Sequence, residues 1–498
     1  MIQNPIISAE TKAFLDSDLG LLIDGAWQPA AEGGTFTSTD PATGETLATV
    51  SCATATDIDL AVAAARRAFE GPWSLLSGFE RAHLMRKLAR LVDANHALFT
   101  ELEVLDNGMP IGIAQMVVAN EARLFDYYAG WAERIEGITT TPPAHVLAMG
   151  EAFTYTLREP VGVVGQIVPW NVPLSMACLK MAPALAAGCT IVLKPAEDTP
   201  LSAILLGRLI MEAGFPAGVV NIVNGDGAVA GAALVKHPDI DKISFTGSTE
   251  VGRLIIREAA ETLKKVSLEL GGKSPVVVFD DADLDSAVPG VAMATFFLQG
   301  QNCMAGTRIF VHDRIHDEFV ERLAAFVGGM TIGHGMDPAT QVGPLISTEH
   351  RARVEGFIAS GIEQGARLVA GGKSLPGPGN FLEPTIFADT TPDMRIVREE
   401  IFGPVMAIQR FTDDDLDAVA RQANDSIFGL SGSVWTQNLS KAHRMASRIR
   451  SGHVSINTHG AVGANIPFGG YKQSGWGREF GKEGMDLYLE TKAITVKL

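Results

Sequence analysis

The sequence predicts an α/β protein in which helices cover both faces of a parallel sheet. From Glu159 onward, short apolar runs alternate with helical segments of ten or more residues. The runs are hydrophobic at consecutive positions, which is typical of strands buried on both faces. With 498 residues, 46% of them hydrophobic and 19% charged, the chain also has enough material for more than one buried core.

Charge and cysteine content narrow the class of protein. With 57 acidic and 40 basic residues the formal net charge is −17, so neither a nucleic-acid partner nor a membrane surface is expected. The four cysteines show no zinc-ligand spacing, and we predict no metal site and no disulfide framework. No leader and no membrane-spanning stretch is recognisable. We therefore expect a cytoplasmic protein that acts on small molecules.

The first part of the chain predicts amphipathic helices. Asp57 to Phe69 places apolar residues on one face, with Thr56 as the expected N-cap and Gly71 as the stop. Two further helices are expected at residues 84–92 and 113–135. Residues 137–150, which include a Pro-Pro pair, interrupt this pattern, and Ala152 to Arg158 then alternates like a half-exposed strand.

Residues 159–270 alternate regularly between strands and helices. The expected strands are residues 161–168, 190–194, 219–223, 242–245 and 266–270. The helices between them include residues 174–188 and 200–214, the second capped by Thr199. Strands joined by helices of this length form a parallel sheet, which predicts a Rossmann-like nucleotide-binding architecture.

A second α/β pattern follows and predicts a second domain. Its strands are expected at residues 275–279, 308–312, 404–410, 432–436 and 453–456. Residues 371–379, rich in glycine and proline, predict a surface loop. The last segment, residues 486–498, predicts a strand without a local partner. It pairs either with residues 153–157 or with a partner subunit.

Polar residues follow four strands of the first region, at the edge where open α/β sheets bind ligands. They are residues 169–171, 194–197, 246–252 and 269–272. Gly247 to Gly252 opens a helix expected from Thr249 to Ala260, whose free N–H groups suit a pyrophosphate, although the spacing is not G-x-G-x-x-G. Glu197 suits ribose hydroxyls and favours NAD over NADP, whereas Lys194 could pair with a 2′-phosphate.

Cys303 is the candidate nucleophile. It lies in a small-residue turn between two apolar segments, within Phe296 to Arg308. A thiol attacks carbonyl carbon readily when its pKa is lowered or a base stands near it. The alternative is a buried cysteine that only packs, which is the usual state of a free cysteine.

Seven motifs, in order along the chain, resemble those of the aldehyde dehydrogenase superfamily, and the resemblance extends from about Leu21 to the C-terminus. They are Pro169-Trp170-Asn171, Lys194-Pro195-Ala196-Glu197, Phe245-Thr246-Gly247-Ser248, residues 268–275, Gly300-Gln301-Asn302-Cys303, residues 400–405 and Pro467-Phe468-Gly469-Gly470. The resemblance implies an NAD-binding domain (residues 1–136 and 159–270), a catalytic domain (271–470) and a β oligomerisation arm (137–158 and 486–498). It also implies a homo-oligomer, a tetramer built as a dimer of dimers.

The resemblance implies a role for each catalytic residue. Cys303 would attack the aldehyde, and Asn171 with the Cys303 N–H would hold the oxyanion. Glu269 would activate the water that hydrolyses the thioester. Lys180 and Glu479 match positions that relay protons or support Glu269, although an ordinary ion pair explains them equally well.

The resemblance also implies the residues that line the cofactor and the aldehyde. The NAD-binding residues would be Ile167, Pro169, Trp170, Lys194, Glu197, Phe245, Gly247, Ser248, Val251, Leu270, Glu400 and Phe402. The aldehyde tunnel would be lined by Asn120, Val172, Met176, Leu179, Phe297, Asn302, Ala461, Val462 and Phe468.

The tunnel residues favour an uncharged substrate with a ring. None is Arg or Lys, which a carboxylate-bearing semialdehyde would need as a partner. Val172, Ala461 and Val462 leave room for a ring, so we expect an aromatic or arylaliphatic aldehyde such as phenylacetaldehyde. A broad aliphatic aldehyde dehydrogenase also fits this lining.

Two other functions are alternatives to aldehyde oxidation to the free acid. A coenzyme A-acylating enzyme would not need Glu269 as a base. A non-catalytic dinucleotide-binding homologue would be expected to have lost Cys303, Glu269 or Asn171, and all three are present.

Overall fold

The computed structural model describes residues 6–412 and 415–498. The predicted strands of residues 159–270 form one sheet. The strand order is β19-β11-β10-β7-β8-β9-β1-β2. Its five central strands are β7 (Val163–Ile167), β8 (Thr190–Lys194), β9 (Val220–Ile222), β10 (Lys242–Thr246) and β11 (Lys265–Glu269). They run parallel, as their apolar sequences predict.

The two edges of this sheet differ from the prediction of a wholly parallel sheet. β1 (Leu21–Ile23) and β2 (Ala26–Gln28) form a hairpin whose first strand pairs antiparallel with β9. β19 (Gly475–Trp476) pairs antiparallel with β11. These strands have only two or three residues, too few to give a periodic signal in the sequence.

Helices cover both faces of the sheet. Neighbouring residues on one strand, such as Ile191 and Val192, belong to two different buried clusters, as the alternation of side chains along a strand requires. One cluster contains side chains of α3 (Gly78–Ala94), α4 (His96–Asn107), α5 (Ile111–Ala132), α7 (Pro173–Ala187) and α8 (Leu201–Ala213). The other contains those of α2 (Ala55–Glu70), α9 (Ala232–Lys236) and α10 (Thr249–Ala259).

The predicted start of α2 was wrong by two residues. The helix is capped by Thr54 rather than Thr56, because Asp57 then stands at the third helical position and its carboxylate accepts from the Thr54 N–H over 2.8 Å. The long helix α5 also ends at Ala132, short of Ile135.

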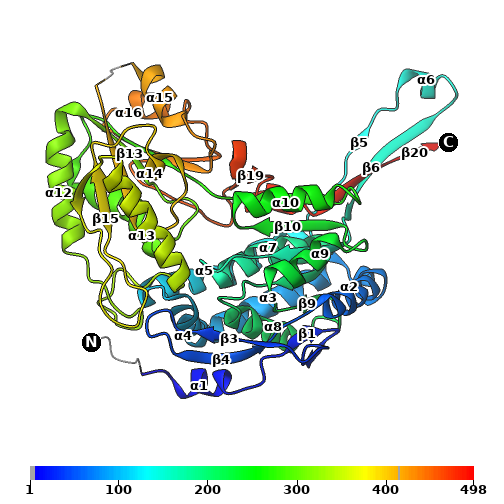
Figure 1. Cartoon of the computed structure of the whole chain (residues 1–498). Helices are drawn as coiled ribbons and strands as arrows, with labels where there is room; N and C mark the ends of the chain where they lie inside the picture. Colours follow the sequence, from blue (N-terminus) through cyan, green and yellow to red (C-terminus); the bar gives the residue numbers. More distant parts are fainter. Residues whose placement is uncertain (1–5, 413–414) are drawn as a thin grey trace.

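The second α/β region forms a seven-stranded sheet of order β14-β15-β16-β13-β12-β17-β18. Its strands are β12 (Pro275–Val278), β13 (Arg308–His312), β14 (Arg367–Ala370), β15 (Thr385–Ala388), β16 (Val405–Phe411), β17 (Ser431–Trp435) and β18 (His453–Ile456). Among its helices are α11 (Leu284–Phe296), α12 (His316–Gly328), α13 (Thr348–Glu363), α15 (Leu416–Asn424) and α16 (Leu439–Ala446). We call this sheet with its helices the second body, and the eight-stranded sheet with its helices the first body; Figure 1 shows the two side by side.

A third, smaller sheet projects from the two bodies as an arm (Figure 1). β20 (Leu489–Lys497) pairs antiparallel with β6 (Ala152–Pro160), and β5 (Thr139–Thr140) lies on the other side of β6. Of the two partners expected for the last strand, the pairing with residues 153–157 is therefore confirmed. Among the residues that the structure describes, no helix has the length and hydropathy needed to cross a membrane.

Candidate active site

Cys303 follows a strained turn at the end of α11. The short helix η3 (Phe297–Gly300) contains Leu298 and Gln299 at φ 53° and 58°, in the left-handed region that non-glycine residues avoid. The Gln299 amide donates to the carbonyls of Gly108 over 3.2 Å and Pro344 over 3.1 Å. These contacts hold the turn in place and fix the direction in which the chain enters the Cys303 loop.

Two further contacts shape the loop at the cysteine itself. Asn302 Oδ1 accepts from the Met304 N–H over 3.1 Å and lies 3.9 Å from the Cys303 Sγ. His459 Nε2 lies 2.8 Å from the Met304 carbonyl, to which it donates. Burial raises the pKa of the Cys303 thiol, and the carboxyls of Glu400 and Glu269 raise it further. The structure thus brings this thiol near two of the predicted site residues.

Asn171 approaches the same loop from the end of β7. Its buried side-chain amide donates to the Gln301 carbonyl over 3.0 Å, two residues before the cysteine. Asn107, on α4, donates to the carbonyls of Trp170 over 2.8 Å and Asn171 over 3.3 Å. The position of Asn171 is therefore fixed from two sides.

Glu269 ends β11 as a buried carboxyl, and its Oε2 has no hydrogen-bond partner within residues 6–412 and 415–498. Burial raises its pKa well above the usual value and Glu479 raises it further, whereas Lys180 and Arg478 oppose the shift. The fully buried Lys180 pairs with Glu479 across 2.5 Å and donates to Ser244 Oγ over 3.1 Å. The structure thus brings Lys180 and Glu479 together as a pair close to Glu269.

The carboxyl edge of the first sheet offers groups that fit NAD. Lys194 pairs with Glu197 across 2.9 Å at the end of β8, and the Glu197 side chain is half exposed. Ser248 Oγ caps α10 by accepting from the Val251 N–H over 3.2 Å. The Thr246 hydroxyl, two residues earlier, is buried and has no hydrogen-bond partner in the described part of the chain. A carboxylate for ribose hydroxyls and a helix N-terminus for phosphates are the groups that a dinucleotide requires.

The remaining residues predicted for the cofactor lie at the same edge. Ile167 ends β7, and Phe245 in β10 packs beneath Gly247, where an added Cβ would stand 2.4 Å from its ring. Leu270 packs against Gly252, at 2.7 Å from the corresponding Cβ position. Bulkier residues at either glycine would have to displace these side chains.

Residues of the second body reach this edge. Glu400 Oε1 accepts from the Gly272 N–H over 2.8 Å, and burial raises the pKa of this carboxyl to about 7. The ring of Phe402 packs edge-on against Trp170, which follows Pro169, with their centroids 5.2 Å apart. The predicted cofactor residues of the two regions therefore lie on facing surfaces.

The predicted aldehyde-lining residues fall in three places. Val172 and Phe297 share a small apolar cluster with Leu298. Met176 and Leu179 lie on α7, whereas Asn120 is exposed on α5. Ala461, Val462 and Phe468 belong to the segment after β18, and Phe468 pairs by its backbone with Glu479. Val172 and Phe297 thus pack against the same cluster, and His453 contacts both the Ala461 carbonyl, 3.1 Å from its Nε2, and the Phe468 ring.

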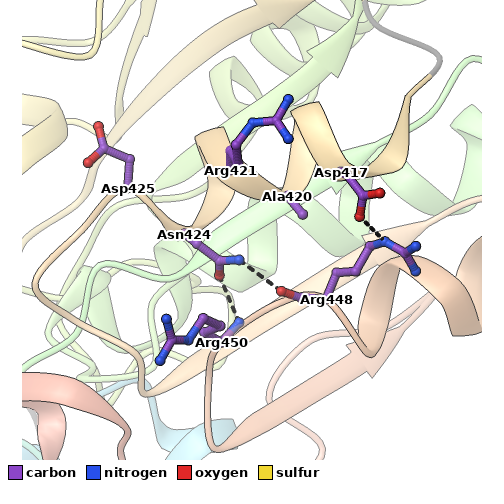
Figure 2. A pocket seen from close by; sticks show the side chains of 7 residues that line it. All are labelled: Asp417, Ala420, Arg421, Asn424, Asp425, Arg448 and Arg450. Carbon is purple, nitrogen blue, oxygen red and sulfur yellow. Dashed lines mark hydrogen bonds and ion pairs between the residues drawn. The ribbon is translucent and has the colours of Figure 1, made fainter.

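A surface hollow of about 690 Å³ lies away from these residues, between α15 and residues 448–450. Figure 2 shows that Asp417 pairs with Arg448 and that the Asn424 side chain bonds the backbone of Arg448 and Arg450. None of the predicted site residues lines it, so it belongs to the surface of the second body.

Neither Asn107 nor His459 is recognisable as a site residue from the sequence. Both act on backbone carbonyls, and each lies more than sixty residues from its partner in the chain. Such contacts follow from the tertiary fold and leave no local pattern.

Comparison with known proteins identifies relatives along almost the whole chain. Residues 27–494 match the model of the aldehyde dehydrogenase family. Retinal dehydrogenase 2 of Homo sapiens is 47% identical over 96% of this chain and 92% of its own length. The mitochondrial benzaldehyde dehydrogenase of Antirrhinum majus is 47% identical over 96% and 89%. The NAD+ complex of an aldehyde dehydrogenase from Bacillus cereus superposes with a TM-score of 0.96 at 45% identity, covering both chains completely.

Proposed function

The chain belongs to the aldehyde dehydrogenase family of NAD-dependent oxidoreductases, and from this premise we propose that it oxidises an aromatic or arylaliphatic aldehyde, such as phenylacetaldehyde, to the carboxylic acid. The observation that carries the proposal is the convergence of residues from the ends of two strands on the loop that contains Cys303. Asn171 reaches Gln301 from β7, and Glu269 at the end of β11 raises the pKa of Cys303. An acyl-transfer site needs an oxyanion donor, a base and a nucleophile, and Asn171, Glu269 and Cys303 would supply them.

The first step is addition of the thiol to the aldehyde. Cys303 Sγ forms a bond to the carbonyl carbon, and the thiol proton leaves for a neighbouring carboxyl or water. The oxyanion accepts from the Cys303 N–H and from Asn171. The Asn171 amide uses one N–H for Gln301, and its second N–H is available for this bond.

Oxidation and hydrolysis complete the reaction. Bound NAD+ supplies the acceptor for the hydride that the carbon loses. Glu269 then takes a proton from water, whose oxygen attacks the thioester as the C–S bond breaks and releases the acid. Oε2 of Glu269 has no hydrogen-bond partner among the residues that the structure describes and is available for that water. Lys180 and Glu479 would pass the proton onward from Glu269.

The cofactor would lie between the two bodies. Glu197 would bind the adenosine ribose, the N-terminus of α10 the pyrophosphate, and Glu400 with Phe402 the nicotinamide end. This assigns residues 1–136 and 159–270 to cofactor binding and 271–470 to catalysis.

The substrate assignment rests on the uncharged lining. No Arg or Lys occurs among the nine predicted lining residues, and Val172 and Phe297 pack against the same apolar cluster. Two relatives at 47% identity are named for retinal and for benzaldehyde. These names agree with an apolar aldehyde rather than a charged one.

We also propose a homotetramer, a dimer of dimers, in which the arm joins subunits. The arm exposes apolar side chains, among them Ile138 and Met149 beside its sheet and Phe153, Leu157 and Val496 on its strands; an interface would remove them from water. A cytoplasmic location agrees with four cysteines that are all free.

A kinetic comparison tests the substrate proposal. NADH formation at ~340 nm, followed with phenylacetaldehyde, benzaldehyde, a long-chain aldehyde and succinic semialdehyde, is expected to give the highest kcat/KM for one of the two ring compounds. A preference for the long-chain aldehyde would replace the proposal with a broad aliphatic dehydrogenase. A preference for the charged semialdehyde would contradict the proposal that the residues lining the aldehyde tunnel favour an uncharged substrate.

A further inference from the structure

Cys303 lies at the centre of a tight turn. The Ala305 N–H donates to the Asn302 carbonyl over 2.9 Å, which closes a four-residue turn around Cys303 and Met304. The Asn302 side chain accepts from the Met304 N–H over 3.1 Å inside the same turn. These contacts involve the peptide units directly before and after the cysteine. They fix the shape of the turn, whereas its position in the molecule depends on contacts with other segments.

Contacts with the second body hold this turn in place. After the turn, the Gly306 N–H donates to the Ala294 carbonyl on α11 over 2.9 Å, and the Gly306 carbonyl accepts from the Thr295 hydroxyl. Within the turn, the Met304 carbonyl lies 2.8 Å from His459 Nε2. Gly306 leaves room for this ring, because an added Cβ would stand 3.2 Å from its Cε1. His459 therefore ties the turn itself, and not only the chain after it, to the second body.

Two side chains of β17 hold His459 from behind. The Nδ1 of its ring lies 2.9 Å from the Ser433 hydroxyl, which accepts from Trp435 Nε1 over 3.3 Å. Ser433 and Trp435 are two residues apart on one strand, so their side chains lie on the same face of the sheet. Both residues are buried. Three side chains thus form a chain of hydrogen bonds that runs from the second sheet to the turn.

The direction of each hydrogen bond in this chain follows from its two ends. The Trp435 indole N–H only donates, and the Met304 carbonyl only accepts. His459 therefore carries its proton on Nε2 and donates it to Met304. Burial lowers the pKa of His459 to about 4, so the ring is neutral near neutral pH and Nδ1 accepts. The Ser433 hydroxyl then donates to Nδ1 while its oxygen accepts from Trp435.

We propose that His459, supported by the two side chains of β17, is a positioning residue for Cys303. By holding the Met304 carbonyl it fixes the turn from which the Cys303 thiol attacks the aldehyde and from which the Cys303 N–H meets the oxyanion. A displacement of about 1 Å at a reacting group can slow a reaction by about 10²-fold. His459 itself needs no contact with the aldehyde. The inference rests on the proposed role of Cys303 as the nucleophile.

Single-turnover kinetics tests the proposal, because it isolates the steps up to NADH formation. Full-length enzyme, in excess over benzaldehyde or phenylacetaldehyde, whichever wild type oxidises faster, is mixed with saturating NAD+, and NADH fluorescence is followed. For His459→Leu, which has no donor, we expect the rate constant to fall roughly 10- to 100-fold. His459→Gln keeps an N–H donor at the end of its side chain and should come within about threefold of wild type.

Ser433→Ala tests the support behind His459. It leaves the donor to Met304 in place but removes the partner of Nδ1, so the ring is held less firmly. We expect a smaller fall in the rate constant, roughly three- to tenfold. A wild-type rate in Ser433→Ala would overturn the part assigned to Ser433. In all three variants NAD+ should bind within about twofold of wild type in a calorimetric titration, since none of these side chains is assigned to the cofactor.

His443 provides the matched control in the same body. It is exposed on α16, so His443→Leu should leave both the single-turnover rate and the NAD+ affinity unchanged. A wild-type rate in His459→Leu would overturn the proposal. A rate for His459→Gln as low as that of His459→Leu would also overturn it, because the donor would then not matter. So would a loss of NAD+ affinity in parallel with the rate, which would indicate a general loss of structure.

A Cys303→Ala variant separates the inference from the function beneath it. If this variant forms NADH at the wild-type rate, the proposed function fails and the inference fails with it. If Cys303→Ala is inactive while His459→Leu is as fast as wild type, the function stands and the positioning role alone fails. An inactive Cys303→Ala together with a slow His459→Leu supports both.

Discussion

The thiol of Cys303 is held in its neutral form by its surroundings. Burial raises the pKa of the thiol, and the carboxyls of Glu400 and Glu269 add to the shift. The backbone N–H groups of Cys303 and Met304 oppose this shift. Attack on an aldehyde therefore requires removal of the proton as the bond forms, or a change in these surroundings when the cofactor binds.

The raised pKa of Cys303 predicts how the rate of its alkylation depends on pH. For an acid with a raised pKa the thiolate fraction rises about tenfold per pH unit until the pKa is reached. The rate at which iodoacetamide modifies Cys303 in the NAD-free protein should therefore keep rising steeply between about pH 7 and pH 9, as followed by peptide mass spectrometry. A plateau below about pH 8 would show a lowered pKa instead.

Asn171 should matter mainly in the transition state. Replacing it with Ala removes one donor to the oxyanion, so we expect kcat to fall by about 10²- to 10³-fold, roughly 3–4 kcal/mol, with a smaller change in KM. Steady-state kinetics measures both values. A normal NAD+ affinity in the variant would show that the fold is intact. A rise in KM alone would contradict the assigned role.

Residues of the site differ in how far the sequence could predict them. Asn171, Glu269 and Glu197 lie at or just beyond the carboxyl ends of strands, so their common edge followed from the strand pattern. Asn107 and His459 support the site through backbone carbonyls of distant segments. Only the folded chain brings these partners together.

At the scale of elements, buried carboxyls of α4 and α5 organise the starts of α7 and α8. Glu103 accepts from the Leu174 N–H over 3.2 Å, and Asp106 from the Leu201 N–H over 3.0 Å. Glu121 accepts from the Ser175 hydroxyl. α7 begins just after Asn171, so these contacts help to place that residue. Acceptors at a helix N-terminus satisfy N–H groups that the helix leaves free.

Glu121 predicts a specific pH dependence of stability. Burial raises its pKa from 4.5 to about 7, while the hydrogen bond from Ser175 opposes the shift. The folded protein keeps this proton after the unfolded chain has released it, so raising the pH from 4.5 to about 7 favours unfolding. Glu121→Gln should therefore gain stability relative to wild type over that range, by at most roughly 3 kcal/mol.

Chemical denaturation at about pH 5 and pH 8 measures this difference. Glu70→Gln, at the exposed end of α2, is the control and should show no such trend. A wild-type advantage that grows with pH would contradict a raised pKa for Glu121.

At the scale of the whole molecule, the alternation of buried strands and helices predicted both α/β bodies, and β8, β13 and β18 have the predicted bounds. The hairpin of β3 (Thr35–Thr39) and β4 (Thr46–Ser51) and the short edge strands were not predicted. The strands of this hairpin are half-exposed, and the edge strands β1 and β19 pair with strands that are distant in the chain.

The arm should determine the assembly. Phe153 and Leu157 lie exposed on β6, and an aspartate at each position would place charge in the proposed interface. We expect the Phe153→Asp/Leu157→Asp double variant to form a smaller particle than wild type by light scattering after size exclusion. Leu439→Asp, exposed on α16 outside the arm, should leave the mass unchanged. An unchanged mass for the double variant would exclude the arm from the interface.

The central claim is that oxidation passes through a thioester on Cys303 that Glu269 helps to hydrolyse. Mass spectrometry of Glu269→Gln after mixing with NAD+ and phenylacetaldehyde tests it most directly. The account predicts a burst of at most one NADH per subunit and a phenylacetyl group on the peptide that contains Cys303. Steady turnover at the wild-type rate, with no acyl group on Cys303, would contradict it.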